Sequence, residues 1–435
     1  MTSILYRNDR PGTFPDSWYA ASTEIPAERP SLLGETTVDV AIVGAGYCGL
    51  TAALTLADMG YSVAVVEAHR AGFGASGRNG GQVGSGFNMD QRQLARRLGA
   101  DDARKLWFLA EEAKALTRAQ VAEYAPEANY RPGILQGEWS RQGAEEARRY
   151  AHFLAREYAY DSEPLDRAAF QNICRSEVYK GGTLDKGAGH LHPLRYVLGL
   201  AKAAEASGVT IYERTEAHHV ESGLVRTGQG RVKANHILIC GNGYLPQLGG
   251  NVTRAYAARV MPINSFIAAT APLGPKAEDV LSQDVAVADD KFVVNYFRLS
   301  EDKRLLFGGR ENYGIGFPRD ILPALRDRME RLFPQLKGVP IDHHWGGTLG
   351  ITMTRLPYLS QLAPGVLAAG GFSGHGVALS GFAGKVLAET AAGDAEQFDL
   401  MTKLPITPFP GGAAARAPLL TLAMTWYSLR DRLGI

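Results

Sequence analysis

The chain has 435 residues, of which 45% are hydrophobic and 50 are glycine, so its composition indicates a folded α/β enzyme and excludes a disordered or fibrous protein. Its length predicts two packed modules, and a net charge of +1 with interspersed signs argues against nucleic acid as the main partner. No stretch of about 18 apolar residues offers a membrane span, and we expect a cytoplasmic protein.

The first predicted unit is a strand, a glycine turn, a helix and a second strand. The β-branched run at 38–43 is typical of a buried parallel strand, and the turn GAGYCG at 44–49 follows at once. Apolar residues then recur at helical spacing until Gly60, and residues 62–66 form a second apolar run that ends at Glu67. This order is typical of a dinucleotide-binding half-site.

The three glycines of the turn have different physical roles. Gly44 allows the tight turn, Gly46 lets the backbone approach a pyrophosphate, and Gly49 lets the helix pack close to the strand. The phosphates would lie on free N–H groups at the helix N-terminus, where the macrodipole is positive. Glu67 would accept hydrogen bonds from ribose hydroxyls and would repel a 2′-phosphate.

A second glycine-rich loop at 71–86 follows directly and favours FAD over NAD. Seven of its sixteen residues are glycine, which suits backbone that is brought close to a ligand. Ser76, Arg78 and Asn79 supply donors for phosphate or flavin oxygens. Downstream of this loop the chain has no further GxGxxG motif, and it has no CxxC pair, so a reductase with two nucleotides is not expected.

The middle of the chain predicts helices and then short strands. The predicted helices are 101–124 and 140–158 within a helical region at 90–160, 195–207 before Gly208, and 318–332. The predicted strands are 232–240, which enters a turn at Gly241, and the short runs 260–269, 285–288, 292–299 and 304–308. The four short runs predict an antiparallel sheet.

The last predicted strand–turn–helix unit lies at 365–391. An apolar run leads into the glycine turn GGFSGHG at 370–376, and a helix at 377–391 follows. The positive end of this helix could support the electron-rich end of a reduced flavin. Residues 417–433 predict a final helix that either docks on the domain surface or forms a membrane-surface or oligomer contact.

Cysteines and histidines in this sequence do not indicate a metal or disulfide framework. The three cysteines are an odd number without framework spacing, and Cys48 and Cys240 are more typical of buried small hydrophobic residues than of nucleophiles. His190 and His192 could share a strand face, but no third ligand accompanies them, so a metal is not expected.

Together these elements predict an α/β fold, with a Rossmann-like FAD-binding domain and a discontinuous α+β substrate domain that contains an antiparallel sheet. The FAD-binding domain is predicted from 30–90, 185–250 and 346–395, the substrate domain from 91–184 and 251–345, and a C-terminal tail with a helix from 396–435.

Motifs spread over residues 18–393 resemble the FAD-dependent D-amino-acid oxidase superfamily. The most specific are ASGRNGGQ at 75–82, GHLHPL at 189–194, and the block that runs from WGGTLGIT at 345–352 to SGHG at 373–376. Within the superfamily they look most like the γ-glutamylputrescine oxidases and their amine-oxidising relatives. The resemblance implies a substrate domain over the flavin, oxidation of an amine C–N bond to an imine and then an aldehyde, and production of H2O2 from O2.

The resemblance also implies how FAD is held. The sarcosine-oxidase branch attaches FAD through a cysteine before the SGHG block, and residues 343–380 contain none, so we expect non-covalent FAD. The candidate cofactor-binding residues are Gly44, Ala45, Gly46, Tyr47, Cys48, Gly49, Glu67, Ala68, Ser76, Arg78, Asn79, Gly80, Gly81, Gln82, Ala217, Gly241, Gly374, His375, Gly376 and Val377.

Three residues are candidates for catalysis or substrate binding. His375 is a candidate polar group near the flavin, and Arg298 is a candidate bidentate clamp for a substrate carboxylate. Tyr296 and Phe297 alternate on one strand, so only one of them faces the flavin. Such an enzyme must bind the amine deprotonated, orient its C–H bond and exclude water, and a dedicated base is not required.

For the substrate, a small amine like γ-glutamylputrescine is favoured over an N-methyl or D-amino acid. For the electron acceptor, O2 is favoured over a quinone or carrier, and a flavin sensor without enzymatic activity is a further alternative. The sequence predicts no particular oligomeric state.

Overall fold

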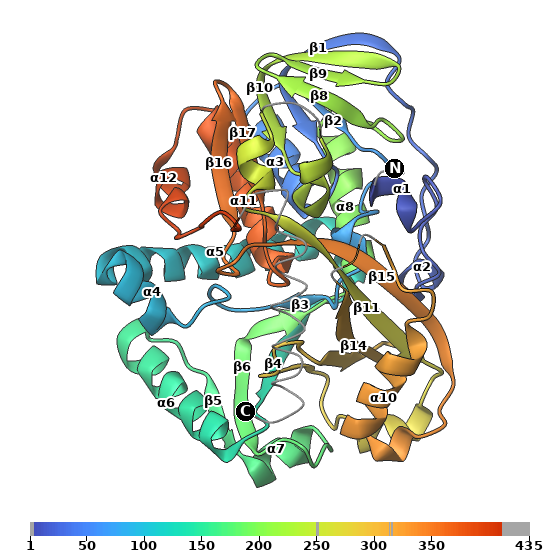
Figure 1. Cartoon of the computed structure of the whole chain (residues 1–435), viewed down its shortest axis with the longest axis vertical. Coiled ribbons are helices and arrows are strands. Elements are labelled where there is room, and N and C mark those ends of the chain that lie inside the picture. Colours follow the sequence, from blue (N-terminus) through green and yellow to red (C-terminus); the bar gives the residue numbers. More distant parts are fainter. Residues whose placement is uncertain (1–3, 249–251, 313, 315, 411–435) are drawn as a thin grey trace.

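Two mixed β-sheets with surrounding helices make up the protein, and this confirms the predicted α/β class (Figure 1). The computed structural model describes residues 4–248, 252–312, 314 and 316–410, so the helix predicted at 417–433 lies outside the described residues. In Figure 1 the eight-stranded sheet forms the upper half of the molecule and the nine-stranded sheet the lower half.

The eight-stranded sheet has a parallel centre. β1 pairs in parallel with β10 on one side and β2 on the other, so that Val43 lies opposite both Ile239 and Val66. The order is β16–β17–β10–β1–β2–β7, with β9 also beside β10 and β8 beside β9. The strands are β1 (Gly34–Val43), β2 (Val63–Val66), β7 (Thr210–Tyr212), β8 (Ala217–Glu221), β9 (Leu224–Thr227), β10 (Gly230–Ile239), β16 (Tyr358–Ala363) and β17 (Val366–Gly370).

Three apolar helices pack together beside this sheet. α3 (Tyr47–Asp58) lies between α8 (Pro193–Ala206) and α11 (Val377–Ala391), and all three contribute to one large hydrophobic cluster. Most of the side chains of α3 and α11 are buried, which explains why apolar and small residues recur around both helices. The starts of α3 and α11 therefore have fixed positions relative to each other.

The nine-stranded sheet has the order β15–β11–β14–β13–β12–β4–β6–β3, with β5 beside β6. Its strands are β3 (Gln82–Val83), β4 (Arg131–Gly137), β5 (Glu163–Asp166), β6 (Gly181–His190), β11 (Met261–Thr270), β12 (Ala286–Asp289), β13 (Tyr296–Leu299), β14 (Leu305–Asn312) and β15 (Ile341–Ile351). The antiparallel pairing predicted for the four short runs is confirmed, since β11 pairs with β14, β14 with β13 and β13 with β12. β12 and β4 pair in parallel.

The remaining helices are α1 (Ile4–Arg7), α2 (Trp18–Ala21), α4 (Gln91–Leu98), α5 (Ala100–Tyr124), α6 (Arg141–Tyr158), α7 (Arg167–Ile173), α9 (Arg254–Ala257), α10 (Leu322–Leu332) and α12 (Glu396–Thr402). The short 3₁₀ turns are η1 (Ala75–Gly77), η2 (Pro126–Ala128), η3 (Asn242–Gln247), η4 (Gly274–Asp279) and η5 (Pro334–Leu336). The predicted helices are confirmed at α5, α6, α8, α10 and α11. Among the described residues, every helix is too short or too polar to cross a membrane.

Two predicted elements differ from the structure. Residues 131–137 form β4 inside the region predicted as helical, because pairing with β6 and β12 outweighs the helix-rich composition around them. The strand predicted from 292 begins only at Tyr296, since the side chain of Asn295 donates to Asp289 Oδ2 at 2.6 Å and closes a turn before it. The division into two discontinuous domains stays a prediction; β15 crosses one predicted boundary and pairs with β11 along its length.

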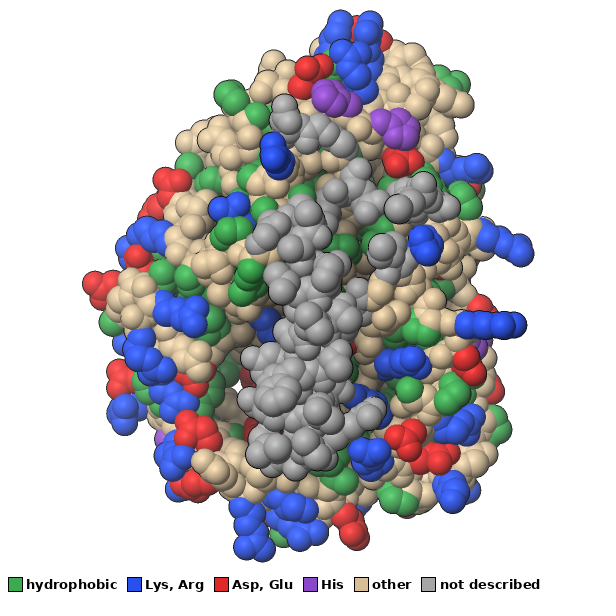
Figure 2. Space-filling model, viewed as in Figure 1, with side chains coloured by type: hydrophobic (Ala, Val, Ile, Leu, Met, Phe, Trp, Pro, Cys, Tyr) green, Lys and Arg blue, Asp and Glu red, His purple; other side chains and the backbone are tan. Residues whose placement is uncertain are grey.

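Charged side chains of both signs are interspersed over the face drawn in Figure 2. This distribution agrees with the near-zero net charge of the sequence.

Candidate active site

One cavity of about 850 Å³ gathers segments that are far apart in the sequence. Its walls include the fingerprint turn at 46–48, the second glycine loop at 75–82 and the turn at 372–377. The second sheet adds Ile267 and Tyr296 to the lining. The three motifs that predict a flavin site therefore meet at a single cavity.

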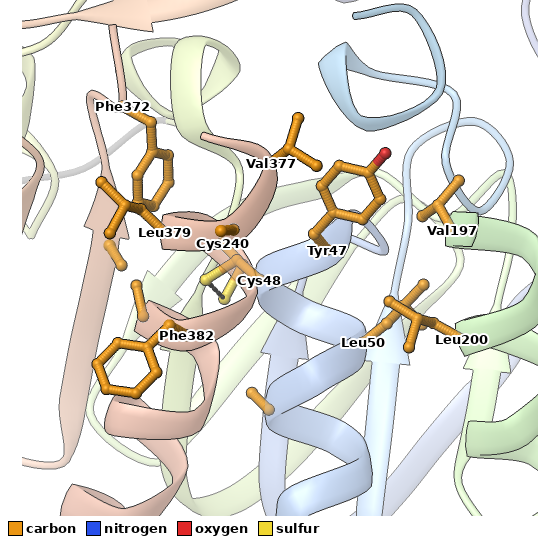
Figure 3. Close-up of a cluster of buried hydrophobic side chains, with 14 of the residues drawn as sticks. Tyr47, Cys48, Leu50, Val197, Leu200, Cys240, Phe372, Val377, Leu379 and Phe382 are labelled. Atoms are coloured by element: carbon orange, nitrogen blue, oxygen red, sulfur yellow. Dashed lines mark hydrogen bonds between the residues drawn. The ribbon is translucent and has the colours of Figure 1, made fainter. Parts of the chain in front are cut away.

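Two helices begin at this cavity with a glycine at the N-cap. Gly46 precedes α3 and Gly376 precedes α11, and neither glycine has a side chain that could cap the free N–H groups. Figure 3 shows Tyr47 and Cys48 at the start of α3 close to Val377 at the start of α11. Both helix dipoles thus present their positive ends to the cavity, which favours a ligand with anionic groups.

The fingerprint turn has no room for side chains. A Cβ added to Gly49 would lie 1.9 Å from the carbonyl oxygen of Gly44, and Gly44 itself has φ of +108°. A Cβ on Gly46 would lie 2.8 Å from Ser76 Oγ. The close packing of α3 against β1 agrees with the role predicted for Gly49, and Ser76 leaves no room for a side chain at Gly46.

Cys48 and Cys240 form a buried thiol pair behind the turn. Their Sγ atoms lie 3.3 Å apart and share a hydrogen bond, drawn as a dashed line in Figure 3. The hydrogen bond from Cys48 and burial raise the pKa of Cys240 well above its usual value. Both cysteines are free and buried, as predicted, and both contribute to the lining of the cavity.

Arg78 has a guanidinium nitrogen without a partner. Its Nε donates to the carbonyl of Phe73 at 2.8 Å, and its Nη1 donates to Asp9 Oδ2 and to the carbonyl of Gly346, both at 3.0 Å. Nη2 has no hydrogen-bond partner in the described part of the chain, although Arg78 is buried and lines the cavity. A buried unsatisfied donor is costly, so this nitrogen fits an acceptor atom of a ligand.

Asn79 holds the loop in shape. Its side-chain nitrogen donates to the carbonyls of Ala75 and Ser76 at 3.0 Å, and its Oδ1 accepts from the N–H of Gly81 at 2.7 Å. Its amide therefore stabilises the loop backbone, and its predicted contact with ligand oxygens stays a prediction. Ser76 Oγ accepts from the N–H of Tyr47 at 3.1 Å, which joins the loop to the start of α3.

These residues fit FAD. Two helix N-termini that begin at the cavity and the unpartnered Nη2 of Arg78 suit a pyrophosphate and a flavin with its carbonyl oxygens. The predicted cofactor-binding residues that line the cavity are Gly46, Tyr47, Cys48, Ser76, Arg78, Asn79, Gly80, Gln82, Gly374, His375, Gly376 and Val377. Those outside its lining are Gly44, Ala45, Gly49, Glu67, Ala68, Gly81, Ala217 and Gly241.

Glu67 lies behind the fingerprint turn at the end of β2. Its Oε2 accepts from the N–H of Ala45 and its Oε1 from the N–H of His69, each at 2.9 Å. Burial raises the pKa of Glu67, and these backbone hydrogen bonds oppose that rise. The carboxylate thus braces the turn; its contact with a ribose stays a prediction.

His375 is a neutral imidazole that faces the cavity. Its Nε2 lies 3.1 Å from the carbonyl oxygen of Gly86, and a Cβ on Gly84 would lie 2.5 Å from its Cε1 atom. Burial lowers the pKa of His375, and the charge of Lys114 lowers it further. The ring is therefore fixed against the 84–86 backbone and uncharged at neutral pH.

Lys114 lies beneath this backbone and was missed by the sequence analysis. Its buried Nζ donates to Ser85 Oγ at 2.6 Å and to the Tyr160 hydroxyl at 2.9 Å, and it pairs with Glu111 at 2.9 Å. Asp185 accepts from Ser85 Oγ at 2.6 Å. A lysine on a helix is usually exposed, so only the tertiary structure reveals this network.

Tyr296, and not Phe297, faces the cavity. Its ring lies over two glycines, since a Cβ on Gly308 would lie 2.1 Å from it and a Cβ on Gly80 2.9 Å. Its hydroxyl lies 3.2 Å from Ser265 Oγ, whereas Phe297 is buried in the core of the second sheet. The alternative that the strand period left open is thereby resolved in favour of Tyr296 as the cavity residue.

Arg298 is not brought into the cavity. Its guanidinium donates to the carbonyls of Gly80 at 3.1 Å and Leu191 at 3.0 Å, and it lines a separate hollow of about 340 Å³. This placement does not fit the predicted carboxylate clamp. Arg298 instead joins the second glycine loop, at Gly80, to Leu191 just after β6.

Comparison with known proteins agrees with this site. The family described as FAD dependent oxidoreductase matches residues 39–390. A probable oxidoreductase OrdL of Rhizobium meliloti is 40% identical over 96% of this chain and 97% of its own length. The gamma-glutamylputrescine oxidoreductase of Escherichia coli is 37% identical over 96% of this chain and 99% of its own. Among solved structures, the glycine oxidase of Geobacillus kaustophilus shares the fold with a TM-score of 0.69 and 23% identity, over 82% of this chain and 95% of that one.

Proposed function

The chain belongs to the family of FAD-dependent oxidoreductases, and we propose that it uses non-covalently bound FAD to oxidise the C–N bond of an amine. The observation that carries this proposal is the cavity itself. Its lining combines groups suited to a flavin nucleotide with apolar and aromatic residues of the second sheet. The absence of cysteine from residues 343–380 supports a dissociable cofactor.

Bound FAD supplies the acceptor for a hydride that leaves the carbon next to the nitrogen. Gly46 and Ser76 would hold the pyrophosphate at the start of α3, and the start of α11 at Gly376 would hold the flavin end. Arg78 would donate to a flavin oxygen from Nη2. The contacts of Arg78 with Phe73, Asp9 and Gly346 would hold that donor in place before FAD binds. The side chain of Arg78 would therefore lose little conformational entropy on binding.

The chain itself would bind and orient the amine and exclude water. Tyr296 and Ile267 form an apolar wall that can hold the reacting carbon, and the Tyr296 hydroxyl is fixed by Ser265. The neutral ring of His375 adds a polar group to the cavity without adding positive charge. Burial of these groups strengthens each polar contact with the substrate.

The lining of the cavity supports a substrate with an amine and a carboxylate. Phe292 and Val294 lie in the turn before β13 and line the cavity together with Tyr296. Arg355 also lines the cavity and lies over the ring of Phe292, 4.6 Å from its centroid. Such a wall suits a methylene chain with an amine at one end and a carboxylate at the other. We therefore propose γ-glutamylputrescine, the compound in the name of one relative, as the type of substrate.

We also propose that O2 accepts the electrons and yields H2O2, and one experiment tests the whole assignment. The purified protein should be yellow and release free FAD on denaturation. With γ-glutamylputrescine it should consume oxygen and form an aldehyde, with a kcat/KM far above those for sarcosine and D-alanine. Preference for either amino acid would overturn the substrate, and flavin bleaching without oxygen uptake would indicate a dehydrogenase.

A further inference from the structure

Three arginines line the cavity, and their side chains have different partners. Arg78 pairs with Asp9 at 3.0 Å, and its unpartnered nitrogen suits the flavin. Arg310 donates from Nη1 to two backbone carbonyls before α10, at 3.3 and 3.4 Å. Arg355 donates from Nη2 to the carbonyl of Phe292 at 3.4 Å. Within the described residues Arg310 and Arg355 pair with no carboxylate, so a ligand carboxylate could balance their charge.

Arg355 lies in a turn that is fixed to the glycine turn at 370–376. Its own turn joins β15 to β16, and the N–H of Arg355 donates to the carbonyl of Thr352 at 3.2 Å. The side chain of Thr352 donates to the carbonyl of Leu356 at 2.7 Å, and its N–H donates to Ser373 Oγ at 3.1 Å. Ser373 belongs to the glycine turn that precedes α11. Arg355 therefore has a defined position relative to the predicted flavin site.

The backbone of Arg355 is left-handed, with φ of +61°. Residues other than glycine rarely adopt this conformation, and they keep it where the surrounding structure determines it, often at ligand sites. The guanidinium lies over the ring of Phe292, which lines the same cavity. An aromatic face holds a guanidinium without using its N–H groups, and only Nη2 contacts the Phe292 carbonyl. Nε and Nη1 of Arg355 therefore remain for a planar carboxylate.

We propose that Arg355 binds the carboxylate of the substrate, the role that the sequence predicted for Arg298. This inference rests on the proposed amine oxidation. Arg355 lines the same cavity as Tyr296, where the reacting carbon is placed, whereas Arg298 lines a separate hollow. A guanidinium that meets the carboxylate favours γ-glutamyl compounds over amines of the same shape that lack this group. Because the carboxylate does not react, the contact stabilises ground state and transition state equally, and its loss should raise KM and leave kcat unchanged.

The kinetic test compares two substrates in the variant Arg355→Gln. γ-Glutamylputrescine has the carboxylate, and N-acetylputrescine has the same amine and amide without it. We expect the ratio of their kcat/KM values to fall by a factor of about 10–100, through a raised KM for γ-glutamylputrescine with kcat near wild type. Arg355→Lys, which keeps the charge but not the two parallel donors, should recover part of the ratio. An unchanged ratio in Arg355→Gln would overturn the inference.

Two further variants separate this role from the general effect of removing an arginine. Arg259 makes the same kinds of contact outside the cavity lining, since its Nη1 donates to the carbonyl of Ala255 at 3.1 Å and its Cζ lies 5.6 Å from the centroid of the Tyr358 ring. Arg259→Gln should leave the ratio unchanged. Arg310→Gln should lower the ratio less than Arg355→Gln does. A larger loss in Arg310→Gln would assign the carboxylate to Arg310 and overturn the inference.

A binding measurement separates this inference from the proposed function and does not require turnover. The probes are γ-glutamylbutylamine, which keeps the carboxylate but ends in a methyl group, and N-butylacetamide, which has no carboxylate. In calorimetric titrations of the FAD-loaded protein, Arg355→Gln should bind γ-glutamylbutylamine at least tenfold more weakly and N-butylacetamide as wild type does, with FAD content and melting temperature near wild type. Equal affinities of wild type and variant for γ-glutamylbutylamine would overturn the role of Arg355 even if amines are oxidised. If the wild type oxidises no amine, the proposed function fails, and the two probes still decide whether Arg355 binds a carboxylate.

Discussion

The substitution Gly49→Ala tests most directly how the fingerprint turn shapes the cofactor site. The added Cβ would lie 1.9 Å from the carbonyl oxygen of Gly44, about 1.5 Å short of ordinary contact. The obstacle is backbone, so no side chain can rotate away, and α3 must move from β1. Because the start of α3 lines the cavity at Gly46 and Tyr47, this movement displaces the N–H groups that would face the pyrophosphate.

Overpacking of this kind costs about 1–3 kcal/mol, which corresponds to a factor of about 5–150 in a dissociation constant. We expect Gly49→Ala to purify with less than stoichiometric FAD, and its apoprotein to bind FAD at least fivefold more weakly in a fluorescence titration. Gly228→Ala is the matched control, since its Cβ would make an ordinary contact of 3.5 Å with His218 Nε2. Stoichiometric FAD with an unchanged dissociation constant in Gly49→Ala would refute the reasoning.

Two further predictions concern residues outside the reacting groups. Arg298→Ala removes buried charge-assisted hydrogen bonds to Gly80 and Leu191, so it should lower the free energy of unfolding by about 1.5–3 kcal/mol and weaken the binding of FAD. An unchanged melting temperature with a raised KM would instead support the role of Arg298 as a carboxylate clamp. Burial and the charge of Asp290 raise the pKa of Glu138 to about 8, so the folded state holds a proton that the unfolded chain releases near pH ~4.3. The contribution of protonated Glu138 to stability is therefore fully present below pH ~4.3 and is lost as the pH rises through about 8. Glu138→Gln should have a higher melting temperature than the wild type at pH 9, and the difference should be smaller at pH 6. Equal margins at both pH values would contradict this assignment.

The sequence predicted the parts of the fold that local patterns determine. The helix predicted at 377–391 is α11 with the same bounds, because apolar periodicity, an opening glycine turn and Gly393 at its end all agree. The strand–turn–helix predicted from residue 38 is also present, although β1 begins four residues earlier, at Gly34, and α3 begins at Tyr47. β4 escaped prediction because its strand character comes from pairing with β6 and β12, which lie far away in the sequence.

The candidate site could be predicted only at the glycine-rich turns, where the backbone would contact the cofactor. Arg298 and Tyr296 lie two residues apart on β13, and the period of two places them on one face. The period does not show that the cavity ends between the two side chains. Tyr296 lines the cavity, whereas Arg298 contacts Leu191 and Gly80. Lys114 is buried through partners from distant elements. This arrangement has no signature in a single sequence.

Anaerobic reduction of the flavin by γ-glutamylputrescine tests the central claim most directly. The purified protein is mixed with the amine without oxygen in a stopped-flow spectrophotometer, and the absorbance of oxidised flavin near 450 nm is followed through one turnover. The account predicts full bleaching that saturates with amine concentration and yields one aldehyde per flavin, and much slower bleaching by sarcosine and D-alanine. Flavin that stays oxidised with every amine, in protein that carries stoichiometric FAD, would contradict it.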